Sequence, residues 1–190
     1  YKEYKKACTA ENMLIKLVEE GENELQYLES VKDLLLRSTL EREFNEIKEE
    51  LVSQGFLKSK SNGKKQMKKA ALPPLEFKTS QGLTVLVGRN NIQNDTLTLK
   101  LSRSRDLWLH TKNIAGSHTL VKYMGEDFPD DVIEVAASIA AYYSKGKSSP
   151  YVEVDYCPVS HVKKPNGAKA GMVIYVKYYT AYVKPDPDLE

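Results

Sequence analysis

The sequence of 190 residues is 41% hydrophobic and 28% charged, with a formal net charge of +2. This length predicts one domain, or one domain with an appendage, and the composition excludes collagen-like, mucin-like and fully disordered chains. No run approaches the ~18 consecutive apolar residues of a membrane span, and no secretory signal is visible. Cys8 and Cys157 lie far apart, which favours reduced thiols over a disulfide framework.

Charge is divided unevenly along the chain. Residues 1–57 hold 8 Lys and Arg against 13 Asp and Glu, whereas residues 58–78 hold 7 basic residues and one acidic residue. The remainder, from residue 79 onward, has 13 basic against 12 acidic residues. The sequence therefore predicts a helical segment over 1–57, a basic linker over 58–74 and a second domain over 75–190.

The segment 1–57 shows helical periodicity in its apolar residues. A helix is predicted over 39–54, where apolar residues step by four, three and four, a narrow heptad-like stripe. Ser38 and Glu41 indicate a capping box at its start, and Gly55 indicates a stop at its end. Thin apolar stripes with so much charge favour a coiled coil or a small bundle. A plain helical subdomain of a single fold is the alternative.

The stretch LKSKSNGKKQMKKAALPP has no hydrophobic periodicity and ends in two prolines, which predicts a flexible linker. A run of lysines is usually solvated surface, but it is also typical of a segment that binds a phosphate backbone electrostatically. The sequence leaves both interpretations open.

From residue 75 onward the pattern predicts an α+β fold, with a mixed or antiparallel sheet and flanking helices. Strands are expected over 83–88, 106–110, 118–123, 151–156 and 172–183. The last of these is nearly continuously apolar, which predicts a central position in the sheet. Helices are expected over 90–101, opened by an asparagine cap, and over 130–144, with acidic residues in its first turn.

The first motif, GRNNIQND, follows the predicted strand that ends at Gly88. Asn90 or Asn91 then caps a helix whose free backbone N–H groups form an anion site. Arg89 adds a charge that can bind a phosphate through two hydrogen bonds. The alternative is a capped turn without a ligand.

The second motif is DLWLHTKNIAGSH. An extended chain places Asp106, Trp108 and His110 on one face, which suits stacking of a nucleobase on Trp108 and hydrogen bonding through Asp106 or His110. His118 follows a Gly-Ser turn and is expected to return beside His110. The alternative is that Trp108 belongs to the core and Asp106 orients a buried His110.

The third motif, HVKKPNGAKAG, predicts a loop between two strands. Its glycines let the backbone approach a ligand, and Lys163, Lys164 and Lys169 supply positive charge for a polyanion. A basic hairpin loop without a ligand is the alternative. The tyrosines that follow, over 175–182, favour strand packing over a stacking platform.

No metal site, cofactor or catalytic centre is predicted. Asp106 and the three histidines match no zinc-binding spacing. Neither Ser117 nor Cys157 lies in a nucleophile elbow. We therefore expect a binding protein and not an enzyme.

Taken together, the blocks GRNNIQND, DLWLHTKNIAGSH and VKKPNGAKAGMVIY resemble the NFACT-R domain of the NFACT family, proteins of the RqcH, NEMF and fibronectin-binding protein A type. The resemblance covers residues 75–187, and the acidic helices before it are similar to part of that family's coiled-coil middle region. Ala115 stands where the family usually has Pro. The matching blocks implicate these residues in RNA contact: Arg89, Asn90, Asn91, Asn94, Asp95, Asp106, Trp108, His110, Lys112, Gly116, Ser117, His118, Lys163, Lys164, Pro165, Gly167, Lys169 and Gly171.

The resemblance implies ribosome-associated quality control. Family members bind obstructed large ribosomal subunits and tRNA and promote C-terminal alanine tailing of stalled nascent chains, while the ribosome makes the bond. The expected partners are the large ribosomal subunit and tRNA, the expected location is on ribosomes in the cytoplasm, and neither a cofactor nor membrane insertion is expected. The alternative function is a fibronectin-binding surface adhesin of a streptococcus-like bacterium.

Overall fold

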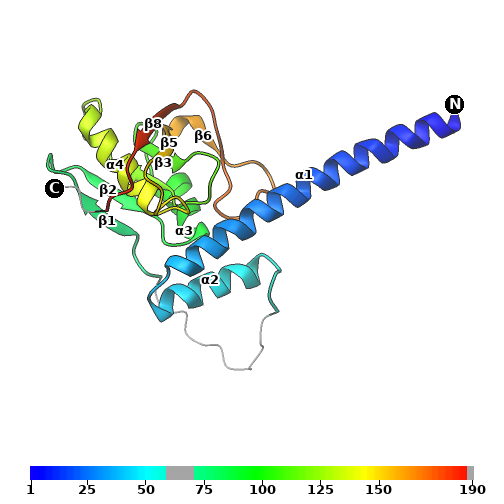
Figure 1. Ribbon diagram of the computed structural model, residues 1–190, viewed down its shortest axis with the longest axis horizontal. Coiled ribbons are helices and arrows are strands. Elements are labelled where there is room, and N and C mark those ends of the chain that lie inside the picture. The colour runs from blue at the N-terminus through cyan, green and yellow to red at the C-terminus, as the bar shows by residue number, and fades with distance from the viewer. Residues whose placement is uncertain (59–70, 188–190) are drawn as a thin grey trace.

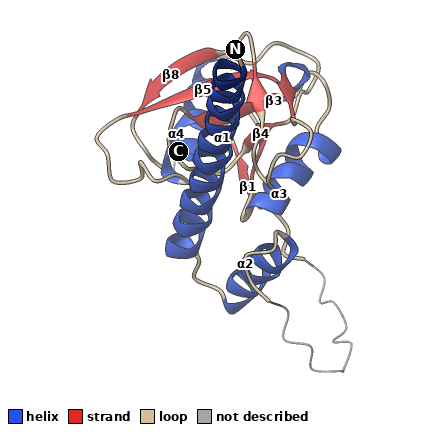
Figure 2. Cartoon of the chain, turned by 90° about the vertical axis from the view of Figure 1, so that its right-hand side faces the viewer, coloured by secondary structure: helices blue, strands red, loops and turns tan. Residues whose placement is uncertain are grey.

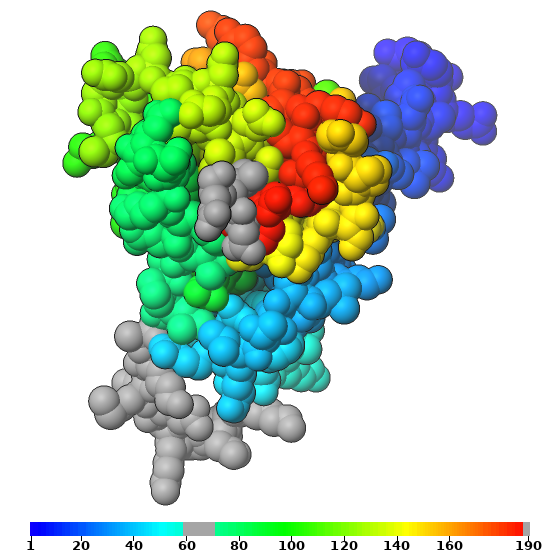
Figure 3. Space-filling view, turned by 60° about the vertical axis from the view of Figure 1, so that its left-hand side comes forward, coloured from blue at the N-terminus to red at the C-terminus, as the bar shows by residue number. Residues whose placement is uncertain are grey.

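The computed structural model describes residues 1–58 and 71–187, so most of the basic linker predicted over 58–74 lies outside the described residues. Two helices, α1 (Lys2–Arg37) and α2 (Glu41–Ser53), precede a compact body of strands and helices (Figure 1). The N-terminal part of α1 extends away from this body (Figure 3). Accordingly, the buried residues of α1 all lie in its last third, from Tyr27 to Leu34.

The junction between the two helices corrects the predicted capping box. The Oγ atom of Ser38 donates to a carbonyl of α1, and the cap of α2 is formed by Glu43 and not by Glu41. One carboxylate oxygen of Glu43 accepts the N–H groups of Thr39 and Leu40, at 2.9 and 3.2 Å. The helix therefore begins two residues later than the Ser38–Glu41 spacing predicts, because Ser38 still belongs to the end of α1.

Six strands form one antiparallel sheet, which confirms the α+β class. Their order across the sheet is β1 (Leu75–Lys78), β2 (Thr84–Val87), β4 (Thr119–Val121), β3 (Leu107–Thr111), β5 (Val152–Pro158), β8 (Tyr179–Val183). A two-stranded ribbon of β6 (Val162–Lys163) and β7 (Ile174–Tyr175) lies beside the sheet. The short helix η2 (Val159–His161) joins β5 to β6.

The main core lies between the sheet and α4 (Asp130–Tyr142), which begins and ends close to its predicted limits. Side chains alternate along β3, so Leu107 and Leu109 pack in this core. Trp108 belongs to a separate cluster with Cys157 and Val162. In Figure 2, α1 passes over the face of the sheet opposite to α4. The face that carries Trp108 therefore lies toward α1.

The apolar run over 172–183 does not form one central strand, and that prediction is wrong. The run is divided into β7 and β8, with Lys177 between them in the left-handed region at φ 53°. β8 lies at an edge of the sheet, where Tyr179 and Tyr182 are exposed. Aromatic side chains on an exposed edge resemble a buried strand in sequence, because hydropathy does not report the turn that separates the two pieces.

The segment predicted as one helix over 90–101 is divided between two helical geometries. α3 (Asn91–Thr96) is followed directly by the π-helix η1 (Leu97–Leu101). The predicted asparagine cap is confirmed: Asn90 precedes α3 and its side chain accepts the N–H of Gln93 at 2.8 Å. Neither α1 nor any other helix in the described residues has the length and apolar composition needed to cross a membrane.

Candidate functional site

The first motif contacts α2. One guanidinium nitrogen of Arg89 lies 2.6 Å from a carboxylate oxygen of Glu43, and the Asn90 amide donates to Glu46 at 2.9 Å. These carboxylates belong to the acidic face of α2. The charge of Arg89, predicted to grip a phosphate, is thus already paired within the chain.

The start of α3 receives an anion from within the protein. Glu50 of α2 is fully buried and accepts the backbone N–H of Asn91 at 3.2 Å and its amide at 3.0 Å. The Tyr27 hydroxyl of α1 donates to the same carboxylate at 2.8 Å. Burial raises the pKa of Glu50 above its ordinary value, while these hydrogen bonds oppose that rise. Three helices therefore meet at one buried carboxylate.

The later residues of the first motif connect it to the other two. The Asn94 side-chain oxygen accepts the backbone N–H of His118 in the second motif at 3.1 Å. Asp95 forms an ion pair with Lys164 of the third motif at 2.8 Å and accepts the N–H of Gly171 at 3.1 Å. Lys164 is therefore held by the fold, although the sequence suggested a free charge.

Asp106 does not bind a ligand together with Trp108 and His110, because its carboxylate is used by other parts of the chain. Its two carboxylate oxygens accept the N–H groups of Arg103 and Tyr123, at 2.8 and 2.9 Å, and one of them lies 3.0 Å from the Lys122 ammonium. Asp106 has no exposed surface. Its hydrogen bonds connect the loop before β3 to the end of β4.

Four aromatic rings form a cluster on the face of β3 toward α1. The Trp108 ring is nearly parallel to that of His110, with an interplanar angle of 11° and centroids 5.8 Å apart. His118 meets both rings edge-on, at 5.2 and 5.5 Å, so it lies beside His110 as the sequence predicts. Tyr175 of β7 lies 4.8 Å from Trp108. Only 1% of Trp108 is exposed, so its ring is part of a packed wall.

Both histidines of the cluster are held neutral. Burial, together with the neighbouring His110, lowers the pKa of His118 to about 3, and burial also lowers the pKa of His110. His118 shares a hydrogen bond of 2.8 Å with the Thr98 hydroxyl. A neutral imidazole offers a flat face, one donor and one acceptor. The cluster therefore presents polar aromatic surface without a net positive charge.

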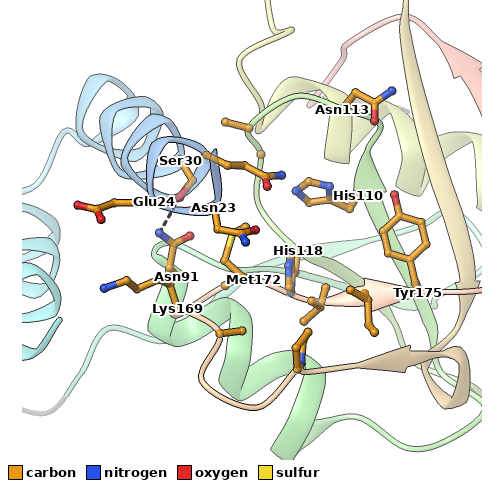
Figure 4. A pocket seen from close by; sticks show the side chains of 18 of the residues that line it. Asn23, Glu24, Ser30, Asn91, His110, Asn113, His118, Lys169, Met172 and Tyr175 are labelled. Carbon is orange, nitrogen blue, oxygen red and sulfur yellow. Dashed lines mark hydrogen bonds between the residues drawn. The ribbon is translucent and has the colours of Figure 1, made fainter. Parts of the chain in front are cut away.

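The cluster forms one side of a cleft of about 550 Å³, which we call the aromatic cleft. The second and third motifs, together with Asn91 and residues 172–175, supply one side, and residues 20–30 of α1 supply the other (Figure 4). Asn23 and Glu24 line the α1 side of the cleft. The lining residues across from them include His110, His118, Lys169 and Tyr175. Sequence reasoning missed the α1 side, because Asn23 and Glu24 lie among many polar residues on an exposed helix and carry no motif.

The remaining predicted residues lie in different surroundings. Ser117 is buried and accepts weak hydrogen bonds from Arg37 of α1, at 3.4 and 3.5 Å. Lys112 lies 3.9 Å from Glu153. The Lys169 ammonium lies 4.7 Å from the centre of the Phe56 ring.

Lys163 differs from the other two lysines of the third motif. It is exposed, and among the described residues its ammonium has no ion-pair partner within 4 Å. In that same part of the chain, no three His, Cys, Asp or Glu side chains gather closely enough to hold a metal ion.

Comparison with known proteins identifies the family. Residues 74–177 match the family described as "NFACT protein RNA binding domain", and residues 1–70 match "NFACT N-terminal and middle domains". The chain belongs to the NFACT family. All three motifs lie within the first of these two matches.

Relatives of this NFACT chain are named as homologues of Rqc2. It is 40% identical over 189 residues to "Rqc2 homolog RqcH" of Bacillus subtilis, covering 99% of this chain and 33% of that protein. A protein of the same name from Streptococcus pneumoniae is 40% identical over 188 residues, which is 98% of this chain and 33% of the relative. The chain spans about a third of the length of these curated relatives.

A solved structure shares the fold. It is the C-terminal part of the fibronectin/fibrinogen-binding protein from Streptococcus suis, with a TM-score of 0.89 and 37% sequence identity. The likeness covers 97% of this chain and 73% of that one. The long helix α1 and the body of this NFACT chain are therefore arranged as in that relative.

Proposed function

We propose that this chain is the RNA- and ribosome-binding part of a ribosome-associated quality-control factor. In this proposal the whole protein binds obstructed large ribosomal subunits and tRNA and promotes C-terminal alanine tailing of stalled nascent chains. It acts on ribosomes in the cytoplasm and is itself no enzyme, because the ribosome makes the bond. The observation that carries the proposal is the match to the NFACT RNA binding domain, which includes all three motifs.

The geometry supports a binding role through two kinds of surface. The aromatic cleft offers stacking and amide groups, which suit unpaired bases of RNA. Positive charge for the phosphate backbone comes from exposed Lys163 and from six lysines between residues 58 and 69. Arg89 and Lys164 contribute less to this charge, because Glu43 and Asp95 already neutralise them.

The proposal is tested by co-sedimentation of the full-length protein with large ribosomal subunits that carry peptidyl-tRNA. The comparison is a version that lacks residues 74–187. We expect that deletion to reduce the fraction that sediments with the subunits, and direct binding of tRNA to the 190-residue chain to weaken with added salt. Equal sedimentation of the two versions, with no binding of tRNA to the chain, would contradict the proposal.

Binding to fibronectin is a second candidate, because the structural relative from Streptococcus suis is named for it. In that case part of the protein acts at the cell surface. The candidate predicts saturable binding of the 190-residue chain to immobilised fibronectin that excess tRNA does not displace. Absence of such binding at micromolar protein would remove it.

A further inference from the structure

The aromatic cleft has walls that suit a flat, polar, uncharged ligand. On one side lie the rings of half-buried His110 and Tyr175. On the other side, α1 presents the exposed side-chain amides of Asn23 and Gln26. Figure 4 shows Asn23 on the α1 side, across from His110 and Tyr175. The volume of about 550 Å³ lies within the range of ligand pockets, ~300–1,000 Å³.

The charges in the aromatic cleft disfavour a phosphate group inside it. The α1 wall carries two negative charges, on the carboxylates of Glu20 and Glu24. The lining residues of the cleft carry one positive charge, on Lys169, because both histidines are neutral. A phosphate that entered would face more negative than positive charge. A ring with N–H donors would instead find carboxylate and amide acceptors along α1.

Positive charge lies just outside the aromatic cleft. Lys163 in β6 pairs in register with Ile174 in β7, and Ile174 lines the cleft. Lys163 is exposed, so a phosphate at this edge would meet a solvated ammonium group. The arrangement separates a region that suits a base from a region that suits the backbone.

The wall also holds a hydrogen-bond donor that the protein does not use. Within the described residues the Trp108 indole N–H is buried without an acceptor. A buried donor without a partner costs free energy, and this nitrogen lies inside the packed wall and not on its open surface.

Resting on the proposed RNA-binding function, we propose that the aromatic cleft receives a single unstacked nucleobase of single-stranded RNA. The base stacks on His110, Tyr175 borders it at an inclined angle, and its edge faces the amides and carboxylates of α1. Carboxylate acceptors favour a base with an exocyclic amino group, which carries two N–H donors where the pairing edge of uracil has the single N3–H, so adenine, cytosine and guanine are preferred over uracil. The phosphates on either side stay outside, next to Lys163.

The chain contains a built-in reporter for this proposal, because Trp108 is its single tryptophan and lines the aromatic cleft. The 190-residue chain is titrated with short oligo(A), oligo(C) and oligo(U), and tryptophan fluorescence and the anisotropy of labelled RNA are recorded together. We expect oligo(A) and oligo(C) to bind more tightly than oligo(U) and to change the Trp108 emission.

Variants in the two walls test where the base lies. His110→Ala is expected to weaken oligo(A) binding by about 5- to 150-fold, the range of one base–aromatic stack, with an unchanged salt dependence. Asn23→Ala and Gln26→Ala remove exposed side chains of α1 and leave the fold intact. They are expected to weaken oligo(A) binding by less than His110→Ala does, and they test the site even if the His110 variant does not fold. His161→Ala and Asn12→Ala, which lie outside the lining, serve as matched controls.

The outcomes separate this inference from the function on which it rests. If RNA binds with unchanged Trp108 emission and equal affinity in the wall variants, the base site is wrong and the RNA-binding function stands. The same conclusion follows if oligo(U) binds as tightly as oligo(A). If the chain binds none of the three oligonucleotides nor tRNA, both are wrong.

Discussion

At the scale of single residues, His118 shows how a polar motif residue becomes part of a packed wall. It has 2% exposed surface, contacts the rings of Trp108 and His110, and shares a hydrogen bond with Thr98. Its backbone N–H donates a hydrogen bond to the side-chain oxygen of Asn94. The imidazole therefore packs in its neutral form, and protonation would place an uncompensated charge in a buried cluster.

This burial predicts an acid-dependent loss of stability. The folded-state pKa of His118, about 3, lies below its ordinary value of 6.5, so the folded state binds fewer protons than the unfolded state. The contribution of neutral His118 to the free energy of unfolding is present above pH 6.5 and is lost as the pH falls from 6.5 toward 3. The free energy of unfolding falls by up to about 1.4 kcal/mol per pH unit in this range. In urea unfolding across this range, His118→Gln should lose stability less steeply than the wild type. His161→Gln is the control, and equal slopes for His118→Gln and the wild type would contradict the assignment.

Lys163 and Lys164 are neighbours in sequence with different tasks. We expect Lys163→Glu to weaken tRNA binding and to make the plot of log affinity against log salt shallower, by about 0.7–0.9 for each phosphate that the variant no longer neutralises, with an unchanged melting temperature. Lys164→Ala breaks the pair with Asp95 and should instead lower the free energy of unfolding by about 1–3 kcal/mol. Salt titrations and thermal melts distinguish them. Exposed Lys184→Glu is the control, and a Lys163 variant that binds tRNA like this control would refute the assignment.

At the scale of secondary-structure elements, three carboxylates of α2 join this helix to the body. Glu43 pairs with Arg89, Glu46 accepts from Asn90, and Glu50 accepts from Asn91. The apolar part of this junction includes Ile47 of α2. Because buried polar groups must find partners, these hydrogen bonds determine how α2 lies against α3.

Glu50→Ala should therefore release α2 from α3. It leaves the Tyr27 hydroxyl and the Asn91 donors without their acceptor, at a cost of about 1–3 kcal/mol for each buried group. Hydrogen exchange should become faster in α2, while β3 and β5 stay protected. Glu49→Ala alters an exposed neighbour and serves as the control. Unchanged protection of α2 in the Glu50 variant would show that the apolar contacts suffice.

At the scale of the whole molecule, the body and the helical part have separate cores. The cluster between the sheet and α4 contains only residues from 75 onward, whereas Tyr27, Val31, Leu34 and Ile47 form a second cluster with Ala170. Residues 2–22 of α1 are all exposed except half-buried Cys8, and several of their apolar side chains are more than half exposed. The long helix thus depends on its last third for tertiary contacts.

We expect residues 75–190 to fold without the helical part, because their core is complete within the segment. Circular dichroism and cooperative thermal unfolding of that fragment provide the test. Its melting temperature should be lower than that of the 190-residue chain, because Arg89 and Asn91 lose their partners on α2. A fragment without a cooperative transition would show that α1 and α2 are required for the core to form.

The sequence alone predicted the elements whose information is local. The period and acidic first turn of α4 indicated its limits, the cap at Asn90 was confirmed, and alternation along β3 put Trp108 and His110 on one face. The family resemblance also predicted the family correctly. These features depend on residues within a few positions of one another, so hydrophobic period, capping and motif spacing are sufficient to reveal them.

The tertiary structure decided which partners distant residues find. The start of α3 looks like an open anion site until Glu50 is seen to fill it, and Arg89 looks like a free charge until it is seen beside Glu43. The sequence also did not reveal that a turn at Lys177 divides the run over 172–183. Nor did it reveal that α1 adds a wall to the aromatic cleft. In each case the outcome depends on contacts between segments tens of residues apart. Local sequence patterns carry no record of which hydrogen-bond and charge partners folding brings together.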